Sequence, residues 1–230
     1  MLQAERQSEF PRLYGLVGFL NCDFLLSQAE PEAGSGLRGF TRQGSRPEKK
    51  ERFRQACREV LERAQKALTI VMNGSKNLLD IALSHLTLGC AHLGLALTDP
   101  REDRPAGLAQ AAEFLNRAMD GLLQAGTEDH LPRGFLARAA LRRFRSDFLG
   151  AAADLTEALE IAERGPMRLH ECDAHLEWAR LCRDQGDLAA ARGHVARAGE
   201  LVRATGYGRR AREVAWLEKE ILAHPNGGSR

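Results

Sequence analysis

The chain has 230 residues, 43% of them hydrophobic and 28% charged, which is the composition of an ordinary globular protein with room for a sizeable core. Its 33 basic and 31 acidic side chains leave a formal net charge of +2. This balance argues against a general nucleic-acid binder, which needs a large basic excess. Aromatic residues make up only 6%, alanine, leucine, arginine and glutamate dominate, and β-branched runs of period two are absent. The composition therefore predicts an all-α fold.

The cysteines and the N-terminal stretch indicate a cytoplasmic protein without membrane contact. The cysteines are odd in number, lack C-x-x-C spacing and lie inside helical patterns, as reduced buried thiols do: Cys22, Cys57, Cys90, Cys172 and Cys182. The apolar stretch 13–26 is too short to cross a bilayer and is interrupted by Asn21 and Asp23. The N-terminus shows no signal-peptide pattern.

Four helical hairpins and a closing helix are predicted along the chain. The first hairpin, 11–72, pairs a helix over 11–28 with one over 48–72. Residues 29–47 between them are rich in Gly, Ser, Pro and Arg and cannot bury enough apolar surface to order the chain, so we expect a flexible insertion. The helix over 11–28 has more apolar side chains than one neighbouring hairpin would cover. We therefore expect self-association or further repeats to cover it.

The second hairpin, 76–124, follows Asn73-Gly74-Ser75, a helix stop with an N-cap candidate behind it. Its first helix, over 76–97, is apolar on nearly every side, which predicts a helix buried on several sides at the centre of the fold. The sequence TDPREDRP then interrupts the helical pattern, and the second helix covers 106–124.

The third hairpin covers 128–146 and 147–164, and the fourth covers 167–185 and 187–204. Asp147 and Asp187 open the second helices, where an N-cap belongs. Glycines stand where helices are expected to stop, at Gly126, Gly165 and Gly206. A closing helix over 209–223 has one apolar stripe and charges elsewhere, as a terminal cap does.

A small-residue pattern recurs every 40 residues. It comprises Ala111, Leu115 and Ala118, then Ala151, Leu155 and Ala158, then Ala191, Val195 and Ala198. Self-similarity at such a period is typical of repeat arrays. The match between hairpins three and four extends to Arg143 and Arg183, among other pairs. Alanines at i and i+7 with a larger residue between them predict a close helix–helix contact.

These residues resemble the tetratricopeptide repeat family, whose second helix has Ala, a large apolar residue and Ala after a small residue in the first helix. Ala139 and Ala179 match that first-helix position, with Gly89 and Gly18 as weaker counterparts. The segments SDFLGAAADLTEAL and GDLAAARGHVARAG resemble the family's turn and second helix. This chain departs from the family in its period of 40 rather than about 34 residues. It also lacks the usual tyrosine and the closing proline.

Two longer segments, AGTEDHLPRGFLARAALRR and LEIAERGPMRLHECDAHLEWARL, are similar to the C-terminal tetratricopeptide arm of bacterial NACHT/STAND-type signalling NTPases. The resemblance implies one domain over residues 1–230, folded as a right-handed solenoid of helical hairpins. It also implies a non-catalytic module that binds a protein or peptide, as the sensor or interaction arm of a larger signalling protein. A free-standing adaptor or scaffold is the alternative.

First-helix residues of the resembled family face a concave groove in which peptides lie. Carried over to this sequence, that register places eight residues in the groove: Arg133, Leu136, Ala140, Arg143, Asp173, Leu176, Arg180 and Arg183. The arginines suit an acidic or carboxylate-bearing segment, because a guanidinium meets a carboxylate in two hydrogen bonds. The competing interpretation is that Asp173, Glu177 and Asp184 neutralise them.

An enzyme or a metal site is the remote alternative, and it depends on Cys172 and His175. Glu171 and His175 share a helix face, but two ligands do not fill a zinc shell and no second cluster has matching spacing. A regular helix offers Cys172 no oxyanion site. The glycine-rich GSGLRGF lacks the Lys-Ser/Thr ending of a phosphate loop. We therefore expect no catalytic residue, no metal and no cofactor.

Overall fold

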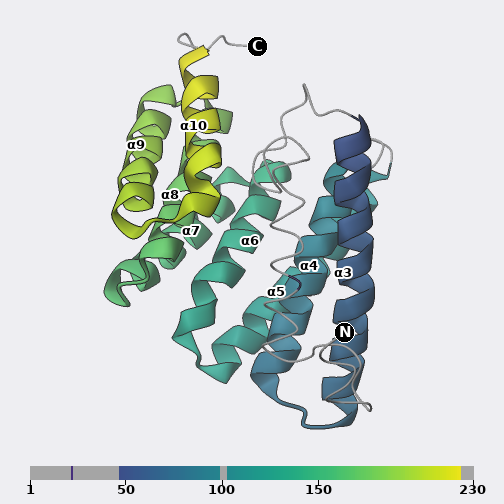
Figure 1. The fold of residues 1–230 in the computed structure, drawn as a ribbon. Helices are drawn as coiled ribbons and strands as arrows, with labels where there is room; N and C mark the ends of the chain where they lie inside the picture. The colour runs from purple at the N-terminus through teal and green to yellow at the C-terminus, as the bar shows by residue number, and fades with distance from the viewer. Residues whose placement is uncertain (1–21, 23–46, 99–102, 224–230) are drawn as a thin grey trace. The chain divides into compact units, whose positions relative to one another are not determined.

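The computed structural model describes residues 22, 47–98 and 103–223. These residues form helices joined by short connections, and no strand occurs among them, which confirms the all-α prediction (Figure 1). The elements are α3 (Pro47–Asn73), α4 (Leu78–Thr98), α5 (Arg104–Ala125), the 3-10 turn η2 (Glu128–His130), α6 (Leu131–Phe144), α7 (Phe148–Arg164), α8 (Arg168–Gln185), α9 (Leu188–Thr205) and α10 (Gly208–Ala223).

Two predictions concern the N-terminal part of the chain. The helix over 11–28 lies outside the described residues except for Cys22, which is helical and buried. The insertion 29–47 lies outside them too, except that Pro47 opens α3. The helices group into two compact units, Met1–Thr127 and Glu128–Arg230. Each unit is described by itself, and the single domain over 1–230 stays a prediction.

In the first unit, α4 packs against both α3 and α5. Its buried residues face several directions, as the all-round apolar sequence predicts. Among the described residues α4 is the one helix long and apolar enough to cross a membrane, but it is mostly buried against its neighbours, and core helices commonly pass that test.

A seam of small residues lets α4 and α5 approach closely. A Cβ built on Gly107 would lie 2.8 Å from the Cβ of Ala96, and one built on Gly121 would lie 2.9 Å from that of Ala82. Between these two contacts, Gly89 faces Leu115. Positions 82, 89 and 96 are one heptad apart on α4 and meet α5 in reverse order, so the two helices are antiparallel neighbours along their whole length.

In the second unit, each helix from α6 to α10 packs against the next one in the chain, and α6 also contacts α8. The repeated small-residue pattern is buried at all nine of its positions, in α5 of the first unit and in α7 and α9 of the second. One core cluster gathers apolar residues of α8, α9 and α10, among them Leu176, Val195 and Leu217. The stripe of the closing helix therefore faces this core, as predicted.

The helix ends follow the predicted capping chemistry, with three exceptions. The first is the start of α4, where the side-chain oxygen of Asn77, not of the predicted Ser75, accepts a hydrogen bond from the backbone N–H of Asp80 at 3.1 Å. The carboxylates of Asp147 and Asp187 accept hydrogen bonds from the backbone N–H groups of residues 150 and 190, at 3.0 and 2.9 Å. Gly126 and Gly206 end helices in the left-handed conformation, with φ of 64° and 69°. Gly165 ends α7 with φ of −90°, outside that region.

The third exception concerns the ends of the two equivalent helices α6 and α8. Gly186 follows α8 with φ of 85°. At the equivalent position after α6, 40 residues earlier, Ser146 takes a φ of 62°. A residue other than glycine is strained in that region.

Candidate functional site

Charged side chains join α6, α8 and α10 in a continuous series of ion pairs, which we call the ladder. Its first connection joins α6 to α8 through Arg143. The Nε of Arg143 donates to Oε1 of Glu177 at 2.8 Å, and its Nη1 donates to Oδ2 of Asp184 at 2.6 Å. Glu177 also accepts a hydrogen bond from Nη1 of Arg180 through its other oxygen, at 2.9 Å. One carboxylate therefore joins arginines of two helices.

The second connection joins α8 to α10. Arg183, the equivalent of Arg143, reaches Glu220 at 2.6 Å and also holds Asp184 at 2.7 Å. Arg143 of α6 and Arg183 of α8 thus each bridge to the helix two elements further along the chain. Arg180 pairs with Glu213 of α10.

In the last connection of the ladder the charges are reversed: the arginine belongs to α10 and the carboxylate to α8. Nε of Arg210 donates to Oδ1 of Asp173 at 2.7 Å, and its Nη1 donates to Glu213 at 2.7 Å. The Tyr207 hydroxyl lies 3.4 Å from the other oxygen of Asp173. The complete ladder comprises Arg143, Asp173, Glu177, Arg180, Arg183, Asp184, Arg210, Glu213 and Glu220.

The inner part of the ladder is shielded from water. Arg180 and Glu177 are fully buried, and Arg143 is 4% exposed. Burial alone would lower the pKa of Arg143, but the carboxylates of Glu177 and Asp184 outweigh it and raise the pKa above its ordinary value. Charges can be buried here because each arginine has a carboxylate within hydrogen-bond distance.

The outer part of the ladder meets solvent. The side chains of Arg183, Asp184 and Glu220 are 15%, 28% and 18% exposed. These three residues form the rim of the ladder.

The eight residues predicted for the groove divide into three groups. Four belong to the ladder: Arg143, Asp173, Arg180 and Arg183. Three are buried apolar residues: Leu136, Ala140 and Leu176. Arg133 is partly exposed in the first turn of α6. Glu177 and Asp184 pair with the arginines predicted for the groove, as the competing interpretation described, whereas Asp173 pairs with Arg210 of α10.

Three members of the ladder were missed by the sequence reasoning. Arg210, Glu213 and Glu220 all belong to α10, whose charges were assigned to a solvent face. Their spacing of three and seven residues places them on one side of the helix, which is the signal that could have identified them.

Outside the ladder, Asp154 is a buried carboxylate inside the third hairpin. Asp154 of α7 accepts two hydrogen bonds from Arg138 of α6, at 2.7 and 3.0 Å, and pairs with Arg142 at 2.9 Å. Arg142 also donates to the Gly150 carbonyl oxygen at 2.8 Å. These arginines of α6 therefore hold α6 and α7 together.

Of the two residues of the remote enzymatic alternative, Cys172 is packed inside the fourth hairpin and His175 is half-buried. Cys172 is fully buried, and its thiol lies 3.7 Å from the carbonyl oxygen of Ala198. Burial, reinforced by the nearby carboxylates of Asp173 and Glu171, raises the pKa of the Cys172 thiol to about 12. A thiol of that pKa is protonated at neutral pH and is a poor nucleophile.

The chain was compared with protein-family models, with curated proteins and with solved structures, and no match was found. The resemblance to tetratricopeptide repeats therefore stays a prediction from the sequence.

Proposed function

We propose that this chain is a non-catalytic helical-hairpin module that binds a segment of a partner protein along the first helices α6, α8 and α10. The observation that supports the proposal is the ladder. Its buried ion pairs join α6, α8 and α10, and it leaves a polar rim of Arg183, Asp184 and Glu220 at the surface. Side chains held in place by such pairs lose little freedom on binding, which favours recognition.

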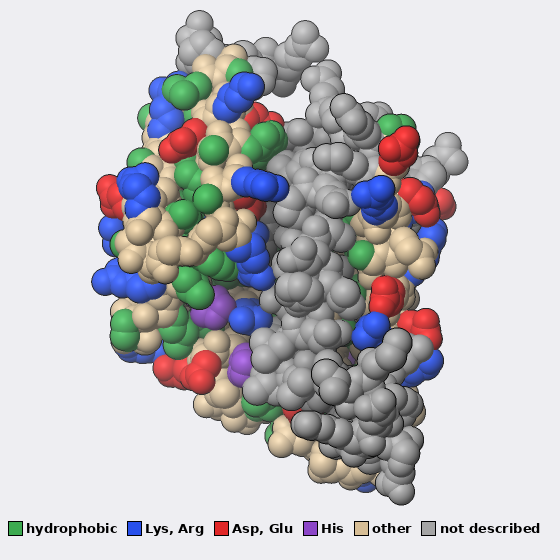
Figure 2. Space-filling model, viewed as in Figure 1, with side chains coloured by type: hydrophobic (Ala, Val, Ile, Leu, Met, Phe, Trp, Pro, Cys, Tyr) green, Lys and Arg blue, Asp and Glu red, His purple; other side chains and the backbone are tan. Residues whose placement is uncertain are grey.

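The buried arginines do not take part in direct recognition. Arg143 and Arg180 are already paired, and a ligand that reached them would have to break buried ion pairs. Arg183 is also paired, with Asp184 and Glu220, but these pairs lie at the rim, so it is the arginine of this set that an acidic or carboxylate-terminated segment can reach. On the face shown in Figure 2, basic and acidic side chains are interspersed over α9 and α10. That mixture supports a protein ligand over a nucleic acid, which calls for a basic surface.

Binding of fluorescein-labelled peptides, followed by fluorescence anisotropy, tests the proposal. The probes are acidic peptides that end in a free carboxylate, their C-terminally amidated counterparts and lysine-rich peptides of equal length. We expect the free-carboxylate peptides to bind best and binding to weaken with salt. Arg183→Gln should reduce affinity about tenfold, the loss of roughly 1.4 kcal/mol. Arg203→Gln, which removes the same charge from the exposed side of α9, is the matched control.

Two results would contradict the proposal. One is equal loss of affinity in both variants, which would reduce binding to general charge attraction. The other is the failure of all three peptide classes to bind.

As part of the same proposal, the module works in the bacterial cytoplasm as the interaction arm of a larger signalling protein. The support for this context is the similarity of 125–143 and 159–181 to such arms. A free-standing adaptor is the alternative. The complete reading frame distinguishes them, because a phosphate-binding loop in the same chain favours the arm.

A further inference from the structure

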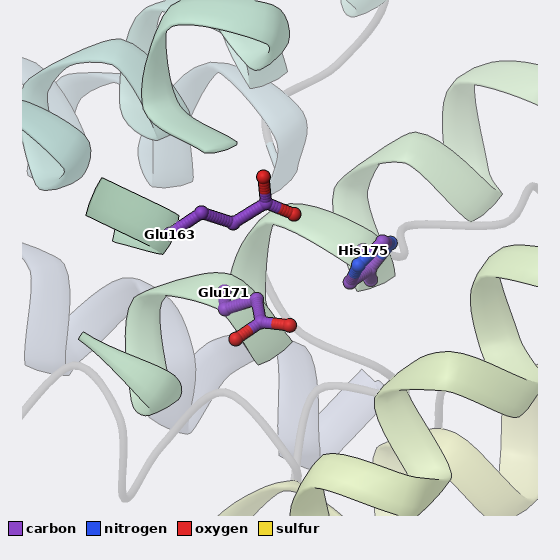
Figure 3. A group of neighbouring side chains, drawn as sticks. All are labelled: Glu163, Glu171 and His175. Carbon is purple, nitrogen blue, oxygen red and sulfur yellow. The ribbon is translucent and has the colours of Figure 1, made fainter. Parts of the chain in front are cut away.

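Three potential metal ligands meet where α7 passes into α8. Figure 3 shows Glu163 from the last turn of α7, with Glu171 and His175 from α8. One carboxylate oxygen of each glutamate and one ring nitrogen of His175 lie within 4.8 Å of one another. Glu171 and His175 are four residues apart and share a face of α8. The connection between α7 and α8 is short, so the start of α8 lies beside Glu163 at the end of α7.

A fourth residue, His194 of α9, holds the imidazole of His175. The Nδ1 atoms of the two rings are 3.0 Å apart, so one of them donates a hydrogen bond to the other. Trp178 stacks on the ring of His194 at a centroid distance of 5.5 Å with an interplanar angle of 8°. When Nδ1 of His175 is the donor, its Nε2 has a free lone pair. Metal-binding histidines usually have their second ring nitrogen engaged in this way.

We propose that Glu163, Glu171 and His175 bind a divalent transition-metal ion of the zinc class, with His194 as the positioning residue. One imidazole with two carboxylates suits Zn²⁺, whereas Mg²⁺ and Ca²⁺ prefer oxygen ligands alone. Three protein ligands leave a fourth position for water. This site is independent of the ladder and of the binding function proposed above.

Two arginines compete with the ion for Glu171. Arg168 and Arg197 each contact a different oxygen of this carboxylate at 2.9 Å. The side chains of the two arginines are 58% and 44% exposed, whereas that of Glu171 is only 3% exposed. Either arginine can turn into solvent when the ion binds. The buried Glu171 then exchanges a guanidinium for a metal ion and keeps a cationic partner.

Titration of the full chain with Zn²⁺, in competition with a chromophoric chelator, tests the proposal. We expect one equivalent to bind. Glu163→Gln removes an exposed ligand and should lower the Zn²⁺ affinity at least tenfold, whereas Glu160→Gln, one turn earlier on α7 and also exposed, should leave it unchanged. His194→Gln should lower the affinity by about 10–100-fold, as loss of a positioning residue does.

Absorption spectra with Co²⁺ identify the ligands. The proposal predicts a spectrum without a thiolate-to-cobalt charge-transfer band, because none of the ligands is a cysteine. His175→Gln should abolish the d–d bands, and far-UV circular dichroism without metal checks that this variant folds. If it does not fold, Glu163→Gln decides. The proposal is overturned if no Zn²⁺ binds, if Glu163→Gln and Glu160→Gln bind equally, or if a thiolate band appears.

Discussion

The close contact of Gly89 in α4 with Leu115 in α5 can be tested by substitution. Overpacking and helix propensity change the stability of Gly89→Ala in opposite directions, so the sign of the net effect shows which of them is larger. In Gly89→Ala, the new Cβ would lie 2.6 Å from Cγ and Cδ2 of Leu115 and 3.1 Å from its backbone nitrogen. Real Cβ atoms do not approach other atoms to 2.6 Å, and the fully buried Leu115 has no solvent to move into. Overpacking of this kind costs about 1–3 kcal/mol. Alanine offsets about 1 kcal/mol of that through its helix propensity.

Two reference variants separate these opposing contributions. Gly193 lies in the exposed middle of α9, where a Cβ would meet nothing within 4 Å, so Gly193→Ala reports the propensity gain alone. Leu115→Ala removes the Cγ and Cδ2 atoms that the new methyl group would meet at 2.6 Å, at a cost of about 2–5 kcal/mol, and leaves the backbone nitrogen at 3.1 Å. In that background Gly89→Ala should change sign and stabilise the protein by at most about 1 kcal/mol.

Urea denaturation followed by far-UV circular dichroism measures the free energy of unfolding for each variant. We expect Gly89→Ala to be less stable than the parent and Gly193→Ala to be more stable. The reasoning is refuted if Gly89→Ala stabilises the parent as much as Gly193→Ala does, because the two helices would then not approach closely at this point.

Three further predictions concern the second unit. Ser146→Gly relieves a left-handed serine and should raise the free energy of unfolding by about 1 kcal/mol, while Gly186→Ser should lower it by a similar amount. Glu177→Gln leaves two buried arginines without their shared carboxylate and should cost roughly 3–5 kcal/mol, against at most about 0.5 kcal/mol for the exposed Glu160→Gln. His175 has a pKa of about 4 in the fold and 6.5 as its ordinary value, so the unfolded chain binds the proton first as pH falls. The stability that His175 contributes is complete above pH 6.5 and declines towards pH 4, and urea midpoints of the parent and of His175→Gln across this range measure it.

The helices could be predicted from the sequence because their signals are local. The closing helix was expected over 209–223 and is observed over Gly208–Ala223. Asp147 and Asp187 each place a carboxylate beside the first free N–H groups, which depends on only a few residues. Ser146 was missed because no glycine marks the turn there. Its equivalence to Gly186 could have revealed the turn.

The members of the ladder in α6 and α8 could be predicted from the sequence, but their pairing could not. Ion pairs between helices depend on how far one helix is shifted along its axis relative to the next. Spacing places Arg143 and Glu177 on first helices, but it does not say which turn of α8 lies beside which turn of α6. The partners in α10 were harder still. Glu213 and Glu220 occur in a helix whose exposed face is also rich in charge, so composition alone cannot separate inner from outer carboxylates.

The ladder has a physical consequence for the register of the second unit. Its core includes many small residues, among them Ala179, Ala191 and Ala198, and a surface of small residues accepts several offsets at similar cost. Buried ion pairs do not tolerate these alternative offsets, because each arginine must stay within hydrogen-bond distance of its carboxylate. A one-turn slip of α10 along α8 would separate Arg180 from Glu213 and leave a fully buried guanidinium short of a carboxylate, at a cost of several kcal/mol. The buried charges thus penalise each alternative offset that the alanines would tolerate, and the observed register is the one in which all of them are paired.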